Sequence, residues 1–146
     1  MRAMTGGCHC GNIAVEMELP RAARTYSPRA CDCDFCRKHG AAYVSDPQGC
    51  LRVRIRDGRD SGTYRQGSEI ADCLFCRNCG VLVGAIYRSE GKIYGVVNAN
   101  VVDSREQFGA QEPVSPKKLS AGEKAQRWKN LWFSDIVIVN VDTQPR

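Results

Sequence analysis

The nine cysteines of this 146-residue chain constrain its structure more than any other feature. Seven of them fall in three short motifs, GCHCG at 7–11, CDCDFC at 31–36 and CRNCG at 76–80. An odd number of cysteines leaves one thiol over in any arrangement made only of disulfides, and MRAMTGGCHCG at 1–11 holds no apolar run of signal-peptide length. We therefore expect metal or redox chemistry in a reducing, cytoplasmic setting.

Length and charge narrow the class of protein further. A chain of 146 residues has the size of one ordinary domain, so we expect residues 1–146 to form a single domain. No segment approaches the roughly 20 apolar residues of a membrane span, so no membrane partner is expected. The formal charge of +5 falls to about +2 if seven cysteines bind two zinc ions as thiolates. The basic residues are also dispersed, as in LRVRIRDGR at 51–59, and we expect no nucleic-acid partner.

The remaining sequence is typical of a mostly β protein with little helix. Alternating or continuous apolar runs predict strands at IAVEMEL (13–19), LRVRI (51–55), VLVGAIY (81–87), KIYGVV (92–97) and DIVIVNV (135–141). The third and fourth runs flank SEG and predict a hairpin, and the fifth predicts a strand buried on both faces. A helix is expected near 120–129, where Ser120 and Glu123 have capping-box spacing, with a shorter one starting at Asp34. The segment QEPVSPKK (111–118) is expected to be a long loop.

Two of the cysteine motifs share a local feature that suggests a common site. Cys76 and Cys79 have the two-residue gap of a zinc knuckle and are followed by Gly80. Cys8 and Cys10 have a one-residue gap and are likewise followed by a glycine, which tolerates the positive φ of such turns. We group the two pairs as one structural zinc site with four cysteine ligands. The competing interpretations are a redox dithiol or incidental buried cysteines.

The triplet Cys31, Cys33 and Cys36 is then left with three ligands. It could take a fourth ligand from His39, Cys50 or Cys73, it could hold an iron centre, or it could bind zinc with one exchangeable position, as catalytic sites do. Single histidines are more often surface residues, and His9 is expected to point outward. Cys50 and Cys73 are expected to be small buried apolar residues.

The three motifs carry a resemblance to a known family. GGCHCGNI at 6–13, CDCDFCRKHG at 31–40 and LFCRNCGVLV at 74–83 resemble the motifs of the glutathione-dependent formaldehyde-activating enzymes, a family that includes centromere protein V. The likeness extends to GVVNANVVD at 95–103 and WKNLWF at 128–133. It implies a β-tent fold of small coiled antiparallel sheets stapled by zinc, which the family shares with a Rab-binding zinc protein.

The resemblance also implies the ligands and the activity. It assigns the structural zinc to Cys8, Cys10, Cys76 and Cys79, in agreement with the grouping above, and an open zinc site to Cys31, Cys33 and Cys36. The fourth ligand of the open site is then water or a substrate thiol. The implied activity is that of a carbon–sulfur lyase, which joins or separates glutathione and formaldehyde through the metal held by these three catalytic cysteines. Two residues depart from the family pattern, since Cys73 stands where many relatives carry a basic residue and Asp34 replaces the commoner serine.

Neighbouring charges and a rival function complete the sequence-based predictions. Arg37 and Lys38 could attract the carboxylates of a peptide thiol or could be solvated surface charges. Asp34 could accept a proton, although an N-cap role is the stronger expectation.

The rival function is a non-catalytic, zinc-stapled protein-binding module whose triplet has a permanent fourth protein ligand. A cysteine-based redox protein would need a metal-free CxxC pair and is a third interpretation.

Overall fold

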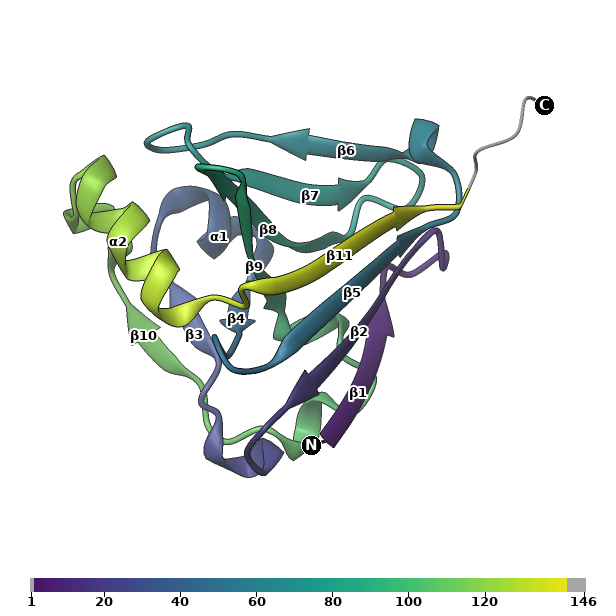
Figure 1. Ribbon diagram of the computed structural model, residues 1–146, viewed down its shortest axis with the longest axis horizontal. Coiled ribbons are helices and arrows are strands. Elements are labelled where there is room, and N and C mark those ends of the chain that lie inside the picture. The colour runs from purple at the N-terminus through teal and green to yellow at the C-terminus, as the bar shows by residue number, and fades with distance from the viewer. Residues whose placement is uncertain (1, 142–146) are drawn as a thin grey trace.

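The computed structural model describes residues 2–141, which form two β-sheets and two α-helices (Figure 1). The strands are β1 (Arg2–Gly7), β2 (Ile13–Leu19), β3 (Arg29–Cys31), β4 (Ala42–Val44), β5 (Cys50–Ile55), β6 (Ser61–Tyr64), β7 (Asp72–Cys76), β8 (Leu82–Ser89), β9 (Lys92–Asn98), β10 (Glu112–Val114) and β11 (Asp135–Asn140). The helices are α1 (Asp34–His39) and α2 (Ala121–Leu131). Short 3-10 turns lie at Ala23–Thr25, Gly58–Asp60, Ala99–Val101, Arg105–Gln107 and Pro116–Lys118. The prediction of a mostly β protein is confirmed.

The four-stranded sheet has the order β1-β2-β5-β11 and shows how the alternating sequence pattern becomes a core. Along β2 the side chains of Ile13, Val15 and Met17 are buried, and the residues between them are exposed. Strand β5 pairs antiparallel with β2 and buries Leu51, Val53 and Ile55 in the same way. Burying each large apolar side chain contributes about 1.5–3 kcal/mol, so these two strands anchor the main core.

Strand β11 corrects one sequence-based prediction. It pairs parallel to β5 at the edge of the sheet, where Ile136 and Ile138 pack against the core. Val137 and Val139 are each 43% exposed on the opposite face, so the prediction of burial on both faces is wrong. The physical reason is that the outer face of this sheet is open to solvent, as exposed Arg54 on the neighbouring strand shows.

The seven-stranded sheet has the order β10-β3-β4-β9-β8-β7-β6 and positions the triplet. Strands β8 and β9 form the predicted hairpin, with Arg88 opposite Ile93 and Ser89 opposite Lys92. Strand β10 lies inside the segment that the sequence predicted as a long loop, and it pairs parallel to β3. That prediction is wrong because three residues with one proline give no periodic signal, although β3 supplies the hydrogen-bonding edge.

The two helices start where the sequence placed them. Ser120 Oγ accepts a hydrogen bond from Glu123 N at 3.2 Å, and the Glu123 carboxylate accepts one from Ser120 N at 2.9 Å, which completes the predicted capping box of α2. Helix α1 begins at Asp34 and ends at Gly40, whose φ of 62° lies in the left-handed region. No helix within residues 2–141 has the length and apolar character needed to cross a membrane.

Candidate metal centres and the adjoining pocket

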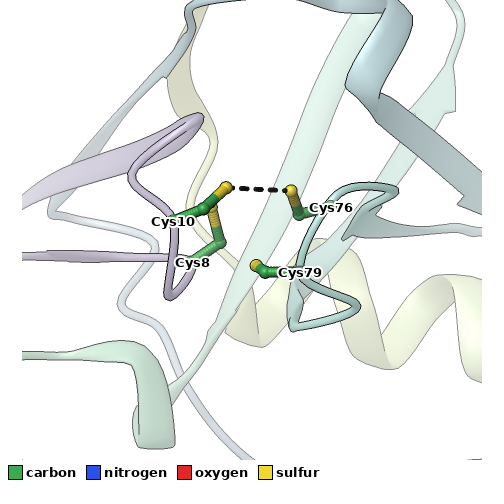
Figure 2. A group of neighbouring side chains, drawn as sticks. All are labelled: Cys8, Cys10, Cys76 and Cys79. Atoms are coloured by element: carbon green, nitrogen blue, oxygen red, sulfur yellow. Dashed lines mark hydrogen bonds between the residues drawn. The ribbon is translucent and has the colours of Figure 1, made fainter.

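Four cysteines from two distant turns converge at the first candidate site (Figure 2). Cys8 and Cys10 lie on the turn between β1 and β2, Cys76 ends β7, and Cys79 lies on the turn between β7 and β8. All four sulfurs lie within 4.8 Å of one another, with Cys8 and Cys10 3.7 Å apart and Cys10 and Cys76 3.5 Å apart. Sulfurs placed tetrahedrally at about 2.3 Å from one zinc ion would be about 3.8 Å apart. The donor set therefore fits a metal ion.

The glycines that follow the two pairs adopt the expected conformation. Gly11 has a φ of 85° and Gly80 a φ of 81°, values that favour glycine over residues with a Cβ atom. The Gly80 amide donates to the carbonyl of Cys76 at 2.8 Å and closes the second turn. The Ile13 amide donates to the Cys8 sulfur at 3.2 Å and orients it. The prediction that His9 points outward is confirmed, since its side chain is exposed.

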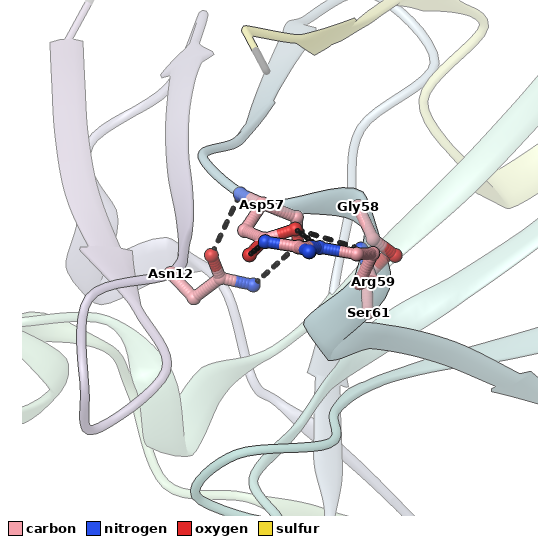
Figure 3. A network of polar contacts seen from close by, with 5 residues as sticks. All are labelled: Asn12, Asp57, Gly58, Arg59 and Ser61. Carbon is pink, nitrogen blue, oxygen red and sulfur yellow. Dashed lines mark hydrogen bonds and ion pairs between the residues drawn. The ribbon is translucent and has the colours of Figure 1, made fainter. Parts of the chain in front are cut away.

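A buried polar link holds the first turn in place (Figure 3). The Asn12 side chain, two residues after Cys10, donates to the carbonyl of Asp57 at 3.0 Å and accepts from the amide of Asp57 at 2.8 Å. The Asp57 carboxylate in turn accepts hydrogen bonds from the guanidinium of Arg59. Asn12 and Asp57 are both buried, so this contact fixes the cysteine turn against the end of β5.

The triplet forms the second candidate site. Cys31 ends β3, Cys33 caps α1 and Cys36 lies inside α1, and their sulfurs lie within 4.8 Å of one another. The hydrogen bond with Cys36 lowers the pKa of Cys31 to about 6, whereas the same contact raises the pKa of Cys36. Three thiol sulfurs this close together can act as ligands to one metal ion.

Tyr43 on β4 is a polar neighbour of the triplet that sequence reasoning missed. Its hydroxyl lies 3.2 Å from the Cys36 sulfur. Burial, followed by the negative charge of nearby cysteines, raises the pKa of Tyr43, so the phenol stays protonated and is able to donate to the Cys36 sulfur. The only signal in the sequence is a tyrosine seven residues after Cys36, too weak to single out.

The charged residues beside the triplet differ from expectation. The N-cap of α1 is Cys33, whose sulfur accepts from the Cys36 amide at 3.4 Å, so the N-cap prediction for Asp34 is wrong. Asp34 occupies the first helical turn, where its carboxylate is largely exposed and 3.7 Å from the Arg37 guanidinium. Lys38 lines a pocket beside the triplet, and Arg37 does not.

That pocket has a volume of about 850 Å³ and is bounded by elements far apart in the sequence. Its walls carry the three triplet cysteines and five aromatic side chains, which are Phe35, Tyr43, Tyr64, Trp128 and Trp132. Five basic residues also line it, Arg29, Lys38, Lys117, Lys124 and Arg127, against two acidic ones, Asp34 and Glu69. The pocket therefore suits an organic anion that reaches the cysteines.

None of the three predicted fourth ligands belongs to the triplet cluster. The His39 ring packs on Phe35, with 4.8 Å between ring centroids. Cys73 on β7 is buried, as predicted, and lines the same pocket. Cys50 is wrongly predicted as buried and apolar, since it is half-buried and its thiol donates to the Glu18 carboxylate at 3.4 Å. Within the described residues the triplet thus offers three protein donors and faces a pocket.

The fold and the site define a class of protein, namely a mostly β protein with two cysteine clusters that could hold metal ions, one closed and one facing a pocket. The family model described as glutathione-dependent formaldehyde-activating enzyme matches residues 3–116. The chain belongs to this family, and the resemblance noted from the motifs is confirmed.

A solved structure supports the same fold. The crystal structure of a Rhodobacter sphaeroides protein is 34% identical in sequence, with a TM-score of 0.51. The match covers 68% of this chain and 88% of the other.

Proposed function

We propose that this protein is a zinc-dependent carbon–sulfur lyase that joins or separates a thiol such as glutathione and a small aldehyde such as formaldehyde. Membership of the formaldehyde-activating family supports glutathione-related chemistry in general. The observation that carries the finer proposal is the position of the triplet, whose three sulfurs face a pocket of about 850 Å³ lined by an excess of basic residues.

The two cysteine clusters have different roles in this proposal. Cys8, Cys10, Cys76 and Cys79 hold a structural zinc ion, which ties the β1–β2 turn to the β7–β8 turn. Cys31, Cys33 and Cys36 would hold the second zinc ion, and a ligand from the pocket could supply the fourth donor. A zinc ion bound there would lower the pKa of a coordinated substrate thiol and keep it as the nucleophilic thiolate.

The chain's own residues bind and orient the reactants. The basic side chains of the pocket attract the carboxylates of the thiol, and Tyr43 donates to Cys36 and limits the negative charge on that sulfur. Trp128 and Trp132, stacked with 4.8 Å between centroids, form an apolar wall of the pocket. In the forward direction the thiol sulfur forms a bond to the aldehyde carbon, and the π electrons of the carbonyl bond move to its oxygen. That oxygen takes up the proton lost by the thiol and becomes a hydroxyl group. The reverse reaction breaks the same bond and returns that proton to sulfur.

This proposal places residues 1–146 in one domain that works in the cytoplasm. Nine free cysteines support that location, because thiols stay reduced there.

The test measures metal content per chain and the X-ray absorption coordination of that metal, with and without glutathione. We expect two zinc ions per chain and an average of fewer than four sulfurs per zinc, rising when glutathione is added. Two zinc ions that already have four protein ligands each and do not respond to glutathione would support the rival binding module. Iron in the triplet would contradict the assignment of zinc.

A further inference from the structure

Two guanidinium groups share the wall of the pocket beside the triplet. Arg29 lies on β3 and Arg127 on α2, and both line the pocket. Arg29 is half-buried, and its Nη2 donates to Ser45 Oγ at 2.7 Å. The Ser45 hydroxyl in turn donates a hydrogen bond to the carbonyl of Leu131 at 2.7 Å. This chain of hydrogen bonds holds the Arg29 side chain in one orientation.

The described part of the chain provides no ion-pair partner for either guanidinium group. Among residues 2–141, neither Arg29 nor Arg127 forms an ion pair. Glu112 lies opposite Arg29 in the β10–β3 register and its negative charge acts on Arg29, but its side chain is exposed and forms no ion pair with it. Arginine keeps its proton at neutral pH, so both side chains carry a positive charge. Two neighbouring cations that form no ion pair within the described residues would be stabilised by a bound anion.

Strand geometry relates these cations to the cysteine site. Arg29 and Cys31 are two residues apart on β3, so their side chains leave the same face of the strand, with Cα atoms about 7 Å apart. A ligand with its sulfur near Cys31 can therefore place a group several bonds away beside Arg29. Arginine is well suited to recognise a planar carboxylate, because its guanidinium donates two parallel hydrogen bonds.

We propose that Arg29 and Arg127 form a carboxylate-binding subsite of the pocket that orients a reactant at the triplet. This inference rests on the proposed thiol and aldehyde chemistry and adds the chemical group that the substrate must carry. The carboxylate belongs either to the thiol, as in glutathione, or to the aldehyde, as in glyoxylate.

The experiment uses the full, zinc-loaded protein and removes charge from one reactant at a time. Isothermal titration calorimetry compares glutathione with its diethyl ester for wild type, Arg127→Gln and the control Lys129→Gln. Lys129 lies on the same helix but does not line the pocket. A parallel assay compares adduct formation from glyoxylate and acetaldehyde in the same variants. Thermal unfolding checks that the variants are folded. Arg29→Lys is a second test variant, which keeps the positive charge but loses the two parallel N–H donors of the guanidinium.

If the thiol supplies the carboxylate, wild type and Lys129→Gln bind glutathione about tenfold more tightly than the ester, and Arg127→Gln loses most of that preference. If the aldehyde supplies it, the thiol preference is small and Arg127→Gln lowers the preference for glyoxylate by a similar factor. If Arg127→Gln and Arg29→Lys change neither the preference for glutathione over its ester nor the preference for glyoxylate over acetaldehyde, the subsite is wrong and the proposed function still stands. A wild-type protein that binds no thiol would overturn the proposed function, and the subsite with it.

Discussion

The contact between Tyr43 and Cys36 shows how one residue can tune the triplet. A thiolate that accepts a hydrogen bond donates less electron density to a bound metal, and the phenol stays protonated because burial raises the pKa of Tyr43. A site with three thiolate donors is a weak Lewis acid, so each hydrogen bond to sulfur favours binding of an additional ligand. Tyr43 is therefore a positioning residue of the proposed thiol site.

Changing Tyr43→Phe tests this role. We expect the fold to survive with a loss of about 1 kcal/mol in unfolding free energy, the usual contribution of one hydrogen bond. We expect the zinc-loaded variant to bind glutathione several-fold more weakly, because the Cys36 sulfur loses its donor. Calorimetry measures the affinity, and Tyr87→Phe is the control, since Tyr87 meets the Trp128 ring edge-on and does not line the pocket. Unchanged glutathione affinity in Tyr43→Phe would remove Tyr43 from the site.

A second prediction concerns the glycine that ends the zinc-knuckle turn. A Cβ atom added at Gly80 would meet no neighbour within 4 Å, so its φ of 81° is the only source of strain. We expect Gly80→Ala to lower the unfolding free energy by about 1–2 kcal/mol. Gly122→Ala, also without a neighbour within 4 Å but in helix α2, should instead be stabilising by about 0.5–1 kcal/mol. Urea denaturation of both variants measures the difference, and an equal effect would contradict the assigned turn geometry.

At the scale of elements, the sequence predicted strands well where one face is buried and less well at a sheet edge. The alternating patterns of β2 and β5 give their inward faces directly, because the side-chain period of a strand is two. The continuous apolar run of β11 predicts a strand but not its exposure, which depends on whether anything covers the outer face of the sheet. Strand β10 was missed because its pairing partner β3 is about 80 residues away in the sequence and gives no local signal.

The two faces of β11 should respond differently to truncation. Ile138 packs against the core, and we expect Ile138→Ala to cost about 2 kcal/mol of unfolding free energy. Val139 is 43% exposed, and we expect Val139→Ala to cost about 0.5 kcal/mol or less. Chemical denaturation of the two variants under identical conditions gives the comparison. A larger cost for Val139→Ala would mean that the outer face is covered in solution.

At the scale of the whole molecule, the candidate metal clusters could be predicted from sequence, and the pocket could not. Each cysteine motif is local, and ligand number together with the following glycines was enough to group the two pairs correctly in space. The pocket joins β3 and α1 to Tyr43, to Cys73 on β7 and to Trp128 on α2. These residues meet only because the chain folds into two sheets with α2 near α1 (Figure 1), so no spacing in the sequence relates them.

The assignment of one structural and one open cysteine site predicts that the two clusters contribute differently to the stability of the fold. Cys79 belongs to a cluster that ties residue 8 to residue 79 across the fold, so we expect Cys79→Ser to unfold the protein or leave it insoluble. Cys33 lies in the triplet, whose residues are close together in the chain, and we expect Cys33→Ser to remain folded but to lose one zinc ion and glutathione binding. Circular dichroism, metal analysis and calorimetry measure these properties. Equal losses of stability in the two variants would contradict the assignment of one structural and one open site. In a separate titration with a chelator, we expect the zinc ion of the triplet to be released before the protein unfolds.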